Sequence, residues 1–457
     1  MARALRRAAV ALPLLLLAAL LLLALRPPDL VRLGAMYTAK IVCSGVFVAG
    51  RDAQQVLEQD VQAPGHPLLR TMQVGVDREA RTVRAGLFGV IGDGLAVARD
   101  GTGCASVPDG DLARAQAHQA PAPRGSALRS TPWPEGDGVD APLPALNTLL
   151  ADPALAGPGA RALLVLHRGR IVAERYASGF DAGTPLLGWS MSKTVNAALL
   201  GTVLAAGRLD PNRRPLFGTW AGDTRREIGL DDLMSMSGGL AFDESYGAVT
   251  DVTRMLYLEP DMAAFAAARP AAHAAGRHFS YSSGSSVLLA RLWQDAVSRE
   301  SLGWPRTALF APLGMTTAVL EADARGSFVG SSYLYASARD WARFALLLLQ
   351  DGRWQDQALL PPGWVQRLWA PSKAAPTEYS QGQMWMHGPR GGTPEGQNPD
   401  AGFGLPADTR WMLGHDGQSL ALVPSRELAV LRLGLTPSRL GWKPQPLLRE
   451  VLRALPP

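Results

Sequence analysis

The chain has 457 residues, which is two to three times the usual length of a single domain. Hydrophobic residues make up 47% of it and charged residues 19%, so a mostly disordered chain is excluded. The net charge is only +5 and the basic residues are scattered, which excludes the dense basic stripe expected of a nucleic-acid-binding protein.

The N-terminus carries a Leu-rich, uncharged run, Ala8–Leu25, which follows three arginines and is closed by Arg26. Eighteen helical residues span about 27 Å, close to the thickness of a bilayer core. Residues 1–29 are therefore predicted to be a retained membrane anchor, with the rest of the chain on the periplasmic or extracytoplasmic side. The alternative is a cleaved signal peptide, which would leave a secreted protein.

Residues 30–142 form a separate N-terminal region, predicted to be small and partly β and to end in a Pro- and Gly-rich linker over 119–142. It contains the two cysteines of the chain, Cys43 and Cys104. An exported protein favours a disulfide between them, and closing a loop of about 60 residues contributes roughly 4 kcal/mol on the chain-entropy model. The alternative is two unrelated buried thiols.

Residues 143–457 have a clearer pattern of secondary structure. The apolar stretches 163–166 and 171–173 flank a polar turn and predict a β-hairpin. Two further apolar strands are expected at 419–424 and 428–433, near the C-terminus, and helical runs occupy 190–350. Strands at both ends and helices between them predict an α/β fold with an antiparallel sheet and an inserted helical region.

The strongest chemical signal is the pair Ser190 and Lys193. Apolar residues then recur at every fourth position and predict a helix with a core-facing stripe: Met191, Val195, Leu199 and Val203. This places Ser190 at the helix N-terminus with Lys193 one turn later on the same face. The chain has only four Lys among 45 basic residues. A buried lysine can deprotonate and activate a serine nucleophile, whereas an arginine cannot.

Two later segments contain candidate partners for Ser190. Tyr281 and Ser283 lie in a loop of small polar residues before an apolar helix, and an ammonium group beside the phenol is expected to lower its pKa. The segment 414–418 contains His415, Gly417 and Gln418, and the backbone N–H groups of Gln418 and Ser190 can form an oxyanion hole. Each segment also has a purely structural interpretation when it is considered alone. Tyr281 can be a loop residue that only packs, and the segment 414–418 can be a tight turn into a strand.

These three motifs, in this order, resemble those of the class C β-lactamases and their relatives, which include D-alanyl-D-alanine carboxypeptidases, esterases and 6-aminohexanoate-dimer hydrolases. The flanking segments 228–240 and 309–315 also resemble the family, and the likeness covers about 143–457. The resemblance implies a sheet domain and a helical domain with the site between them. It also implies an acyl-enzyme on Ser190, proton transfer shared by Lys193 and Tyr281, an oxyanion donor at Gln418, and no cofactor or metal.

Two departures from the class C pattern affect the expected substrate. Ser283 stands where these enzymes have Asn, and His415 stands where they usually have a Lys that helps to hold a substrate carboxylate. Asp416 adds negative charge nearby. A small-molecule or peptide substrate with an ester or amide bond and no adjacent carboxylate fits better than a β-lactam. The alternatives are a D-Ala-type carboxypeptidase or weak β-lactamase and, from another class, a catalytically silent, membrane-anchored envelope-binding protein.

A long Gly- and Pro-rich segment, 371–408, precedes the third motif. Loops of this length are uncommon unless they are functional or disordered. One interpretation is a flap over the acyl pocket, with Tyr379, Trp385 and Phe403 as candidate wall residues. The other is a disordered insertion. The sequence contains no zinc motif of the His-Glu-x-x-His kind, so no metal site is expected.

Overall fold

The computed structural model describes residues 25–121, 131–139, 143–394 and 396–456. The predicted membrane run, apart from Leu25, lies outside the described residues, as does about half of the predicted linker.

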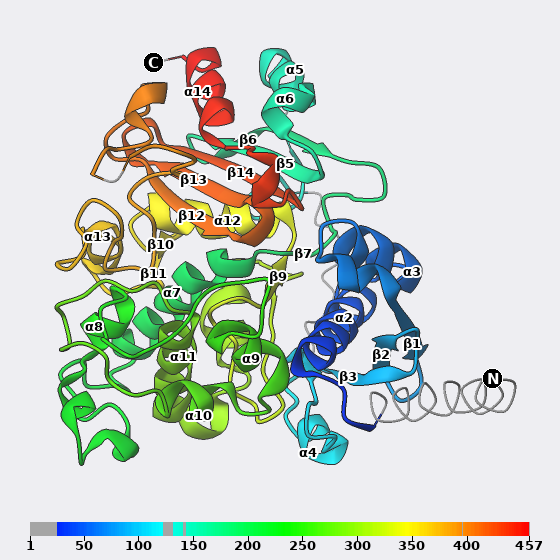
Figure 1. Cartoon of the computed structure of the whole chain (residues 1–457). Helices are drawn as coiled ribbons and strands as arrows, with labels where there is room; N and C mark the ends of the chain where they lie inside the picture. Colours follow the sequence, from blue (N-terminus) through cyan, green and yellow to red (C-terminus); the bar gives the residue numbers. More distant parts are fainter. Residues whose placement is uncertain (1–24, 122–130, 140–142, 395, 457) are drawn as a thin grey trace, which may run out of the picture.

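The central element is a five-stranded antiparallel sheet in the order β12-β13-β14-β5-β6. Its strands come from both ends of the main domain: β5 (Ala160–His167), β6 (Arg170–Tyr176), β12 (Arg410–Gly414), β13 (Gln418–Val423) and β14 (Leu428–Gly434). The pairing of β14 with β5 closes the sheet across the chain (Figure 1). The predicted α/β fold, with an antiparallel sheet flanked by helices, is confirmed.

Helices cover both faces of this sheet (Figure 1). Alternate residues of a strand point to opposite faces, so Leu163 packs with one layer of helices and Leu164 with the other. The first layer contains α5 (Pro144–Ala151), α6 (Pro153–Ala156) and α14 (Gln445–Ala454), and the second contains α12 (Ala338–Leu349).

The helical region lies between β6 and β12 in the sequence and below the main sheet in Figure 1. Its helices are α7 (Ser192–Ala205), α8 (Leu230–Met234), α9 (Asp251–Leu258), α10 (Met262–Ala267), α11 (Ser283–Val297) and α13 (Trp364–Trp369). Short strands in this part of the chain form two small separate sheets. One has the order β7-β9-β8 and the other pairs β10 with β11: β7 (Leu186–Leu187), β8 (Val319–Leu320), β9 (Leu334–Ala336), β10 (Arg353–Trp354) and β11 (Gln357–Ala358). The Ser190 motif begins just after β7, at the junction of the two regions.

The N-terminal region combines one long helix with a four-stranded antiparallel sheet. The elements are α2 (Asp29–Phe47), α3 (Ala53–Val56), β1 (Met72–Asp77), β2 (Thr82–Leu87), β3 (Ile91–Arg99), β4 (Gly103–Ser106) and α4 (Leu112–Gln116). The strands agree with the predicted β content, but the sequence did not indicate α2. This helix lies between the small sheet and α9, where Tyr37 and Tyr257 meet edge to face with ring centroids 5.4 Å apart.

Within the described part of the chain, α2 is also the one helix long and apolar enough to span a membrane. Its mean hydropathy is 1.3, yet 67% of its apolar window is buried inside the protein. A core helix of a folded domain buries most of its apolar residues in this way. In this structure α2 is such a core helix.

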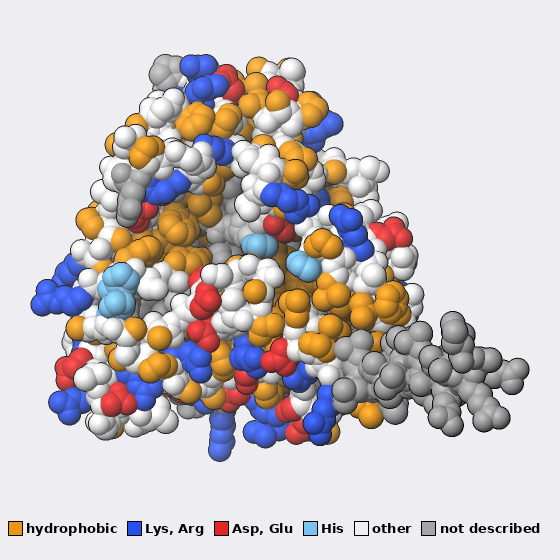
Figure 2. Space-filling model, viewed as in Figure 1, with side chains coloured by type: hydrophobic (Ala, Val, Ile, Leu, Met, Phe, Trp, Pro, Cys, Tyr) orange, Lys and Arg blue, Asp and Glu red, His pale blue; other side chains and the backbone are white. Residues whose placement is uncertain are grey.

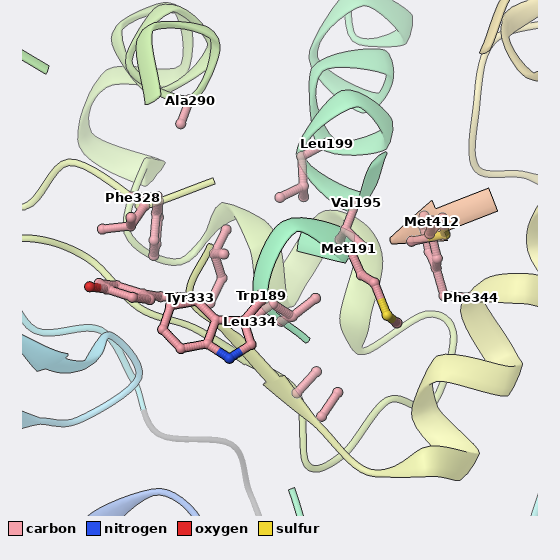
Figure 3. Packing of buried hydrophobic residues seen from close by; sticks show 14 of the residues in the cluster. Trp189, Met191, Val195, Leu199, Ala290, Phe328, Tyr333, Leu334, Phe344 and Met412 are labelled. Carbon is pink, nitrogen blue, oxygen red and sulfur yellow. The ribbon is translucent and has the colours of Figure 1, made fainter. Parts of the chain in front are cut away.

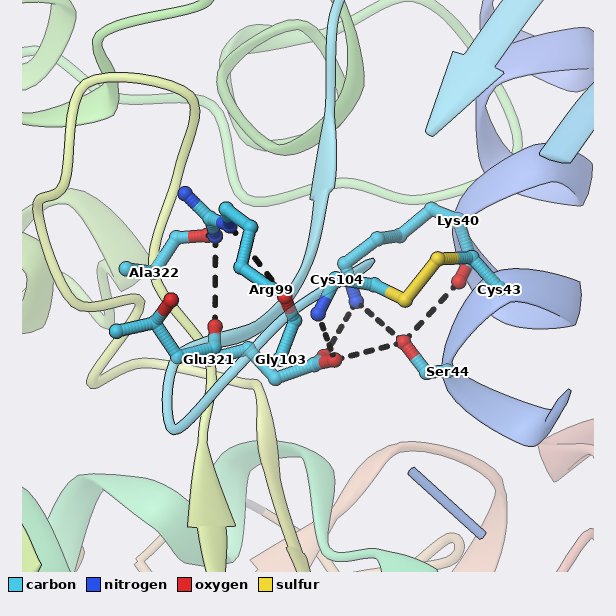
Figure 4. The surroundings of a disulfide bond; sticks show 9 residues. Lys40, Cys43, Ser44, Arg99, Gly103, Cys104, Glu321 and Ala322 are labelled. Atoms are coloured by element: carbon cyan, nitrogen blue, oxygen red, sulfur yellow. Dashed lines mark hydrogen bonds and ion pairs between the residues drawn. A yellow bond between two sulfur atoms is a disulfide. The ribbon is translucent and has the colours of Figure 1, made fainter. Parts of the chain in front are cut away.

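The predicted disulfide between Cys43 and Cys104 is formed and joins α2 to β4 (Figure 4). Beside it, the buried ammonium of Lys40 pairs with the buried carboxylate of Glu321, which belongs to the main domain. Glu321 also accepts hydrogen bonds from Ser44 Oγ at 2.8 Å and from the backbone N–H of Cys104 at 2.7 Å. The N-terminal region is therefore attached to the main domain through a buried polar network next to a covalent crosslink.

Candidate active site

Ser190 lies in a short 3-10 turn, Trp189–Met191, that leads directly into α7. Trp189 has φ of +48°, a left-handed conformation that costs a residue without glycine's freedom about 1–3 kcal/mol. Its indole is only 4% exposed and packs 6.3 Å from the ring of Tyr333 (Figure 3). Burial of this large side chain offsets the backbone strain and fixes the turn that carries Ser190.

The helix after Ser190 is buried on more than the predicted face. Met191, Val195 and Leu199 are fully buried, as the apolar stripe predicted (Figure 3). Lys193 and Asn196, on the other side of α7, are buried as well, because α11 packs against that side. The amine of Lys193 is therefore held inside the protein and not at its surface.

Lys193 Nζ has three hydrogen-bond partners. It lies 3.1 Å from Ser190 Oγ, 3.1 Å from Ser283 Oγ and 3.0 Å from the carbonyl oxygen of Ser331. A protonated amine has three N–H donors, so each of them can be used. The structure thus brings the predicted nucleophile, its predicted activator and the Ser of the second motif into direct contact.

Burial lowers the pKa of Lys193 to about 8, while the nearby carboxylate of Glu244 acts in the opposite direction. Desolvation disfavours the charged amine more than this carboxylate favours it. A substantial fraction of Lys193 is therefore neutral near pH 8 and able to accept the proton of the Ser190 hydroxyl.

Tyr281 adjoins the same pair of residues. Lys193 Nζ lies 4.8 Å from the centroid of its ring. Burial and the Glu244 carboxylate raise the pKa of Tyr281, and a hydrogen bond with Ser190 opposes them only in part. The expected lowering of this pKa by an ammonium group was wrong, because desolvation of the buried phenol is the largest influence on it. The phenol is neutral, which suits a proton donor or relay.

Glu244 is a residue of this site that sequence reasoning missed. Its carboxylate accepts hydrogen bonds from the backbone N–H of Ser283 at 2.7 Å and from Ser283 Oγ at 2.5 Å. Burial raises the pKa of Glu244, and the charge of Lys193 together with the Ser283 bonds counteracts the rise. A continuous chain of hydrogen bonds therefore runs from Ser190 through Lys193 and Ser283 to Glu244.

The third motif forms the turn between β12 and β13 and lies beside the Ser190 turn. The ring of His415 lies between those of Trp189 and Tyr246, with centroids 5.5 and 4.8 Å away. A Cβ on Gly414 would come within 2.3 Å of the carbonyl oxygen of Gly188, so only glycine permits this approach.

The end of this turn that leads into β13 is held by hydrogen bonds to buried groups. The side chain of Gln418 points inward, where its Oε1 accepts a hydrogen bond from the backbone N–H of Gly434 at 2.8 Å. Gly417 has φ of +82° and its carbonyl accepts a bond from Arg432 Nη1 at 3.1 Å. The backbone next to Ser190 is thereby fixed, and the role of the Gln418 N–H as an oxyanion donor stays a prediction.

Two aromatic residues of the segment 371–408 pack against Tyr281, and the flap over an acyl pocket stays a prediction. The ring of Trp385 stacks on that of Tyr281 with centroids 5.1 Å apart, and buried Tyr379 meets Tyr281 edge to face at 5.8 Å. Phe403 lies elsewhere, beside α14, where the Arg449 guanidinium is 6.0 Å from its ring. Figure 2 shows this face of the molecule hollowed below the main sheet, with apolar side chains along one side.

The side chains around Ser190 limit the kinds of reaction that the site can support. Among the described residues, no cluster of three or more His, Cys, Asp or Glu side chains is placed to hold a metal ion. The groups in contact with Ser190 are an amine of lowered pKa and a neutral phenol. This arrangement supports nucleophilic attack by a hydroxyl together with proton transfer.

Comparison with known proteins agrees with the fold. The β-lactamase family model matches residues 150–434, and the chain belongs to this family. The family supports a hydrolase of the serine type in general terms. A search of curated proteins found no match.

Several solved structures share the fold. The protein assigned as a 6-aminohexanoate-dimer hydrolase in Bacillus anthracis is 21% identical, with a TM-score of 0.53 over 65% of this chain and 81% of its own. A protein assigned as a β-lactamase in Bacteroides dorei is 19% identical, with a TM-score of 0.53 over 67% and 96%. A penicillin-binding protein homologue from Caulobacter crescentus is 14% identical, with a TM-score of 0.51 over 69% and 99%.

Proposed function

We propose that this protein is a serine hydrolase that cleaves an ester or amide bond through an acyl-enzyme on Ser190. The observation that carries the proposal is the contact between a fully buried amine, Lys193 Nζ, and Ser190 Oγ at 3.1 Å. Ser190 Oγ attacks the substrate carbonyl and neutral Lys193 takes its proton. The neutral phenol of Tyr281 donates a proton to the leaving group, and water then releases the acyl group.

The charges near Ser190 support a substrate without a carboxylate beside the scissile bond. Glu244 lies on the far side of Ser283 from Lys193, and Asp416 lies next to His415 with Oδ1 3.5 Å from Nε2 of the imidazole. Like charges repel more strongly where water is excluded. The Trp385 and Tyr281 rings offer an apolar surface for an acyl or alcohol group. Anionic β-lactams and peptide carboxylates fit less well.

The rate of acylation should rise with pH. Because only neutral Lys193 accepts a proton, and burial lowers its pKa to about 8, kcat/KM should increase about tenfold per pH unit well below this value and level off above it. The measurement is kcat/KM for a neutral ester from pH 6 to 9.5. A flat profile in that range would mean that Lys193 does not act as the base.

Activity-based labelling tests the function itself. A fluorophosphonate probe should add one label to the full chain. Ser190→Ala should abolish labelling, whereas Ser438→Ala, which removes an exposed hydroxyl outside the site, should retain it. A labelled penicillin, run in parallel, tests the D-Ala-type carboxypeptidase or weak β-lactamase. Absence of labelling and of turnover across esters and amides would favour a silent envelope-binding protein.

The burial of Lys193 disfavours that silent protein. Burying an amine without a direct carboxylate partner costs free energy, and Lys193 contacts two hydroxyls and a carbonyl instead. A fold retained only for binding gains nothing from this arrangement.

We further propose that the protein is tethered to the cytoplasmic membrane by residues 8–25, with the hydrolase domain on the extracytoplasmic side. The arginines before the run favour a cytoplasmic N-terminus, and the Cys43–Cys104 disulfide is compatible with an oxidising compartment. A secreted protein, cleaved after the run, is the alternative. Intact mass of the protein purified from membranes distinguishes the two.

A further inference from the structure

Large apolar side chains are exposed at the end of the N-terminal region where the described chain begins. Val90 is 74% exposed, Leu25 71%, Phe88 61% and Leu30 38%, and the first three are the most exposed large hydrophobic residues in the described ranges. Phe88 and Val90 lie in the turn between β2 and β3. Exposed apolar side chains gathered in one place mark an interaction surface.

This turn lies beside the first residues of α2. A Cβ on Gly92, two residues after Val90, would come within 2.9 Å of the Ala35 Cβ and 3.2 Å of the Val31 carbonyl oxygen. The β2–β3 turn therefore lies close to the N-terminal end of α2. Figure 2 shows apolar side chains on the surface of this part of the molecule.

The connection between the apolar run and the folded region is short. Three residues, Arg26, Pro27 and Pro28, separate Leu25 from the start of α2 at Asp29. Four peptide steps reach at most about 14 Å. A bilayer that holds residues 8–25 must therefore lie close to the N-terminal end of α2, and so to the β2–β3 turn.

We propose that the β2–β3 turn, residues 88–90, rests in the headgroup region of the bilayer that holds the tether, as a second contact between protein and membrane. This inference rests on the proposed tether. Phe88 and Val90 enter the interface, as apolar side chains do in interfacial segments, and exposed Arg26 faces anionic headgroups. Asp93, three residues beyond Val90, is exposed and limits the depth of the contact, since a carboxylate avoids the hydrocarbon.

A spin label at the turn tests this contact in the full chain. Both native cysteines are joined in the disulfide, so Val90→Cys provides a single labelling site in nanodiscs of phosphatidylcholine and phosphatidylglycerol. The control is Leu143→Cys, 41% exposed at the start of α5, far from the turn in Figure 1. The label at position 90 should collide several-fold more with oxygen, relative to a water-soluble nickel complex, than the label at position 143. Adding Phe88→Ser should reduce this difference.

The outcomes separate the contact from the tether. If alkaline carbonate releases the full chain from vesicles, the tether is wrong and the second contact falls with it. If the chain is retained but the label at position 90 is as accessible to the nickel complex as the label at 143, the contact is wrong and the tether stands.

Discussion

Replacing Lys193 with arginine is expected to lower kcat/KM by at least about a hundredfold, within the usual contribution of a general base. Arginine keeps the positive charge, but its guanidinium does not deprotonate in a protein and so cannot accept the proton of Ser190. The effect should appear with every neutral ester that the protein hydrolyses, and raising the pH to 9.5 should not restore the rate.

The matched control is Lys373→Arg, which makes the same change at an exposed position. It should leave kcat/KM unchanged. Thermal unfolding of both variants shows whether the larger guanidinium has disturbed the site. Near-normal activity of a folded Lys193→Arg variant would mean that the side chain acts only as a fixed positive charge.

Replacing Lys40 with methionine is expected to destabilise the protein by about 3–5 kcal/mol, the usual cost of breaking a buried ion pair by removing one partner. Lys40 is 1% exposed and Glu321 is fully buried, so the substitution leaves an uncompensated carboxylate inside the protein. The double variant Lys40→Met/Glu321→Met should lose less than the single one, because it removes both charges.

The control for this prediction is Arg81→Met, which breaks the ion pair with Asp100 in the same region. Arg81 and Asp100 are 41% and 50% exposed, and an exposed pair contributes at most about 1 kcal/mol. Urea unfolding of the full chain in detergent, followed by near-UV circular dichroism, measures all three variants. Equal losses for Lys40→Met and Arg81→Met would show that the buried pair does not stabilise the attachment of the N-terminal region.

The Lys40–Glu321 pair also bears on the proposed site. The backbone N–H of Glu321 donates to the carbonyl of Tyr333, and its carbonyl accepts from the N–H of Val329. These bonds bracket Ser331, whose carbonyl holds Lys193 Nζ. The N-terminal region therefore supports the loop that contacts Lys193.

The parts of the site that could be predicted from the sequence are those encoded by local spacing. Ser190 and Lys193 lie one helical turn apart, so the periodicity of the following helix was enough to place them on one face. The order of the three motifs then indicated the family and the sheet. Four of its five strands were visible because each is apolar and bounded by turn residues, whereas β12 (Arg410–Gly414) was not predicted.

Other features depend on tertiary contacts that leave no periodic pattern. Glu244 lies in a loop and contacts Ser283 across the fold, and no motif in the sequence marks it. The raised pKa of Tyr281 follows from burial, which no spacing reveals. Helix α2 was missed because a charged residue, Lys40, and small residues such as Gly34 and Gly45 interrupt its apolar pattern, although all three are buried.

Trapping the covalent intermediate with a substrate, in place of an inhibitor, tests the role of Ser190 most sharply. The protein is mixed with an activated neutral ester, quenched in acid within the first turnover, digested and mapped by mass spectrometry. We expect one acyl group, on the peptide that contains Ser190, and none in Ser190→Ala. An acyl group on another residue, or ester turnover that persists in Ser190→Ala, would show that Ser190 is not the nucleophile.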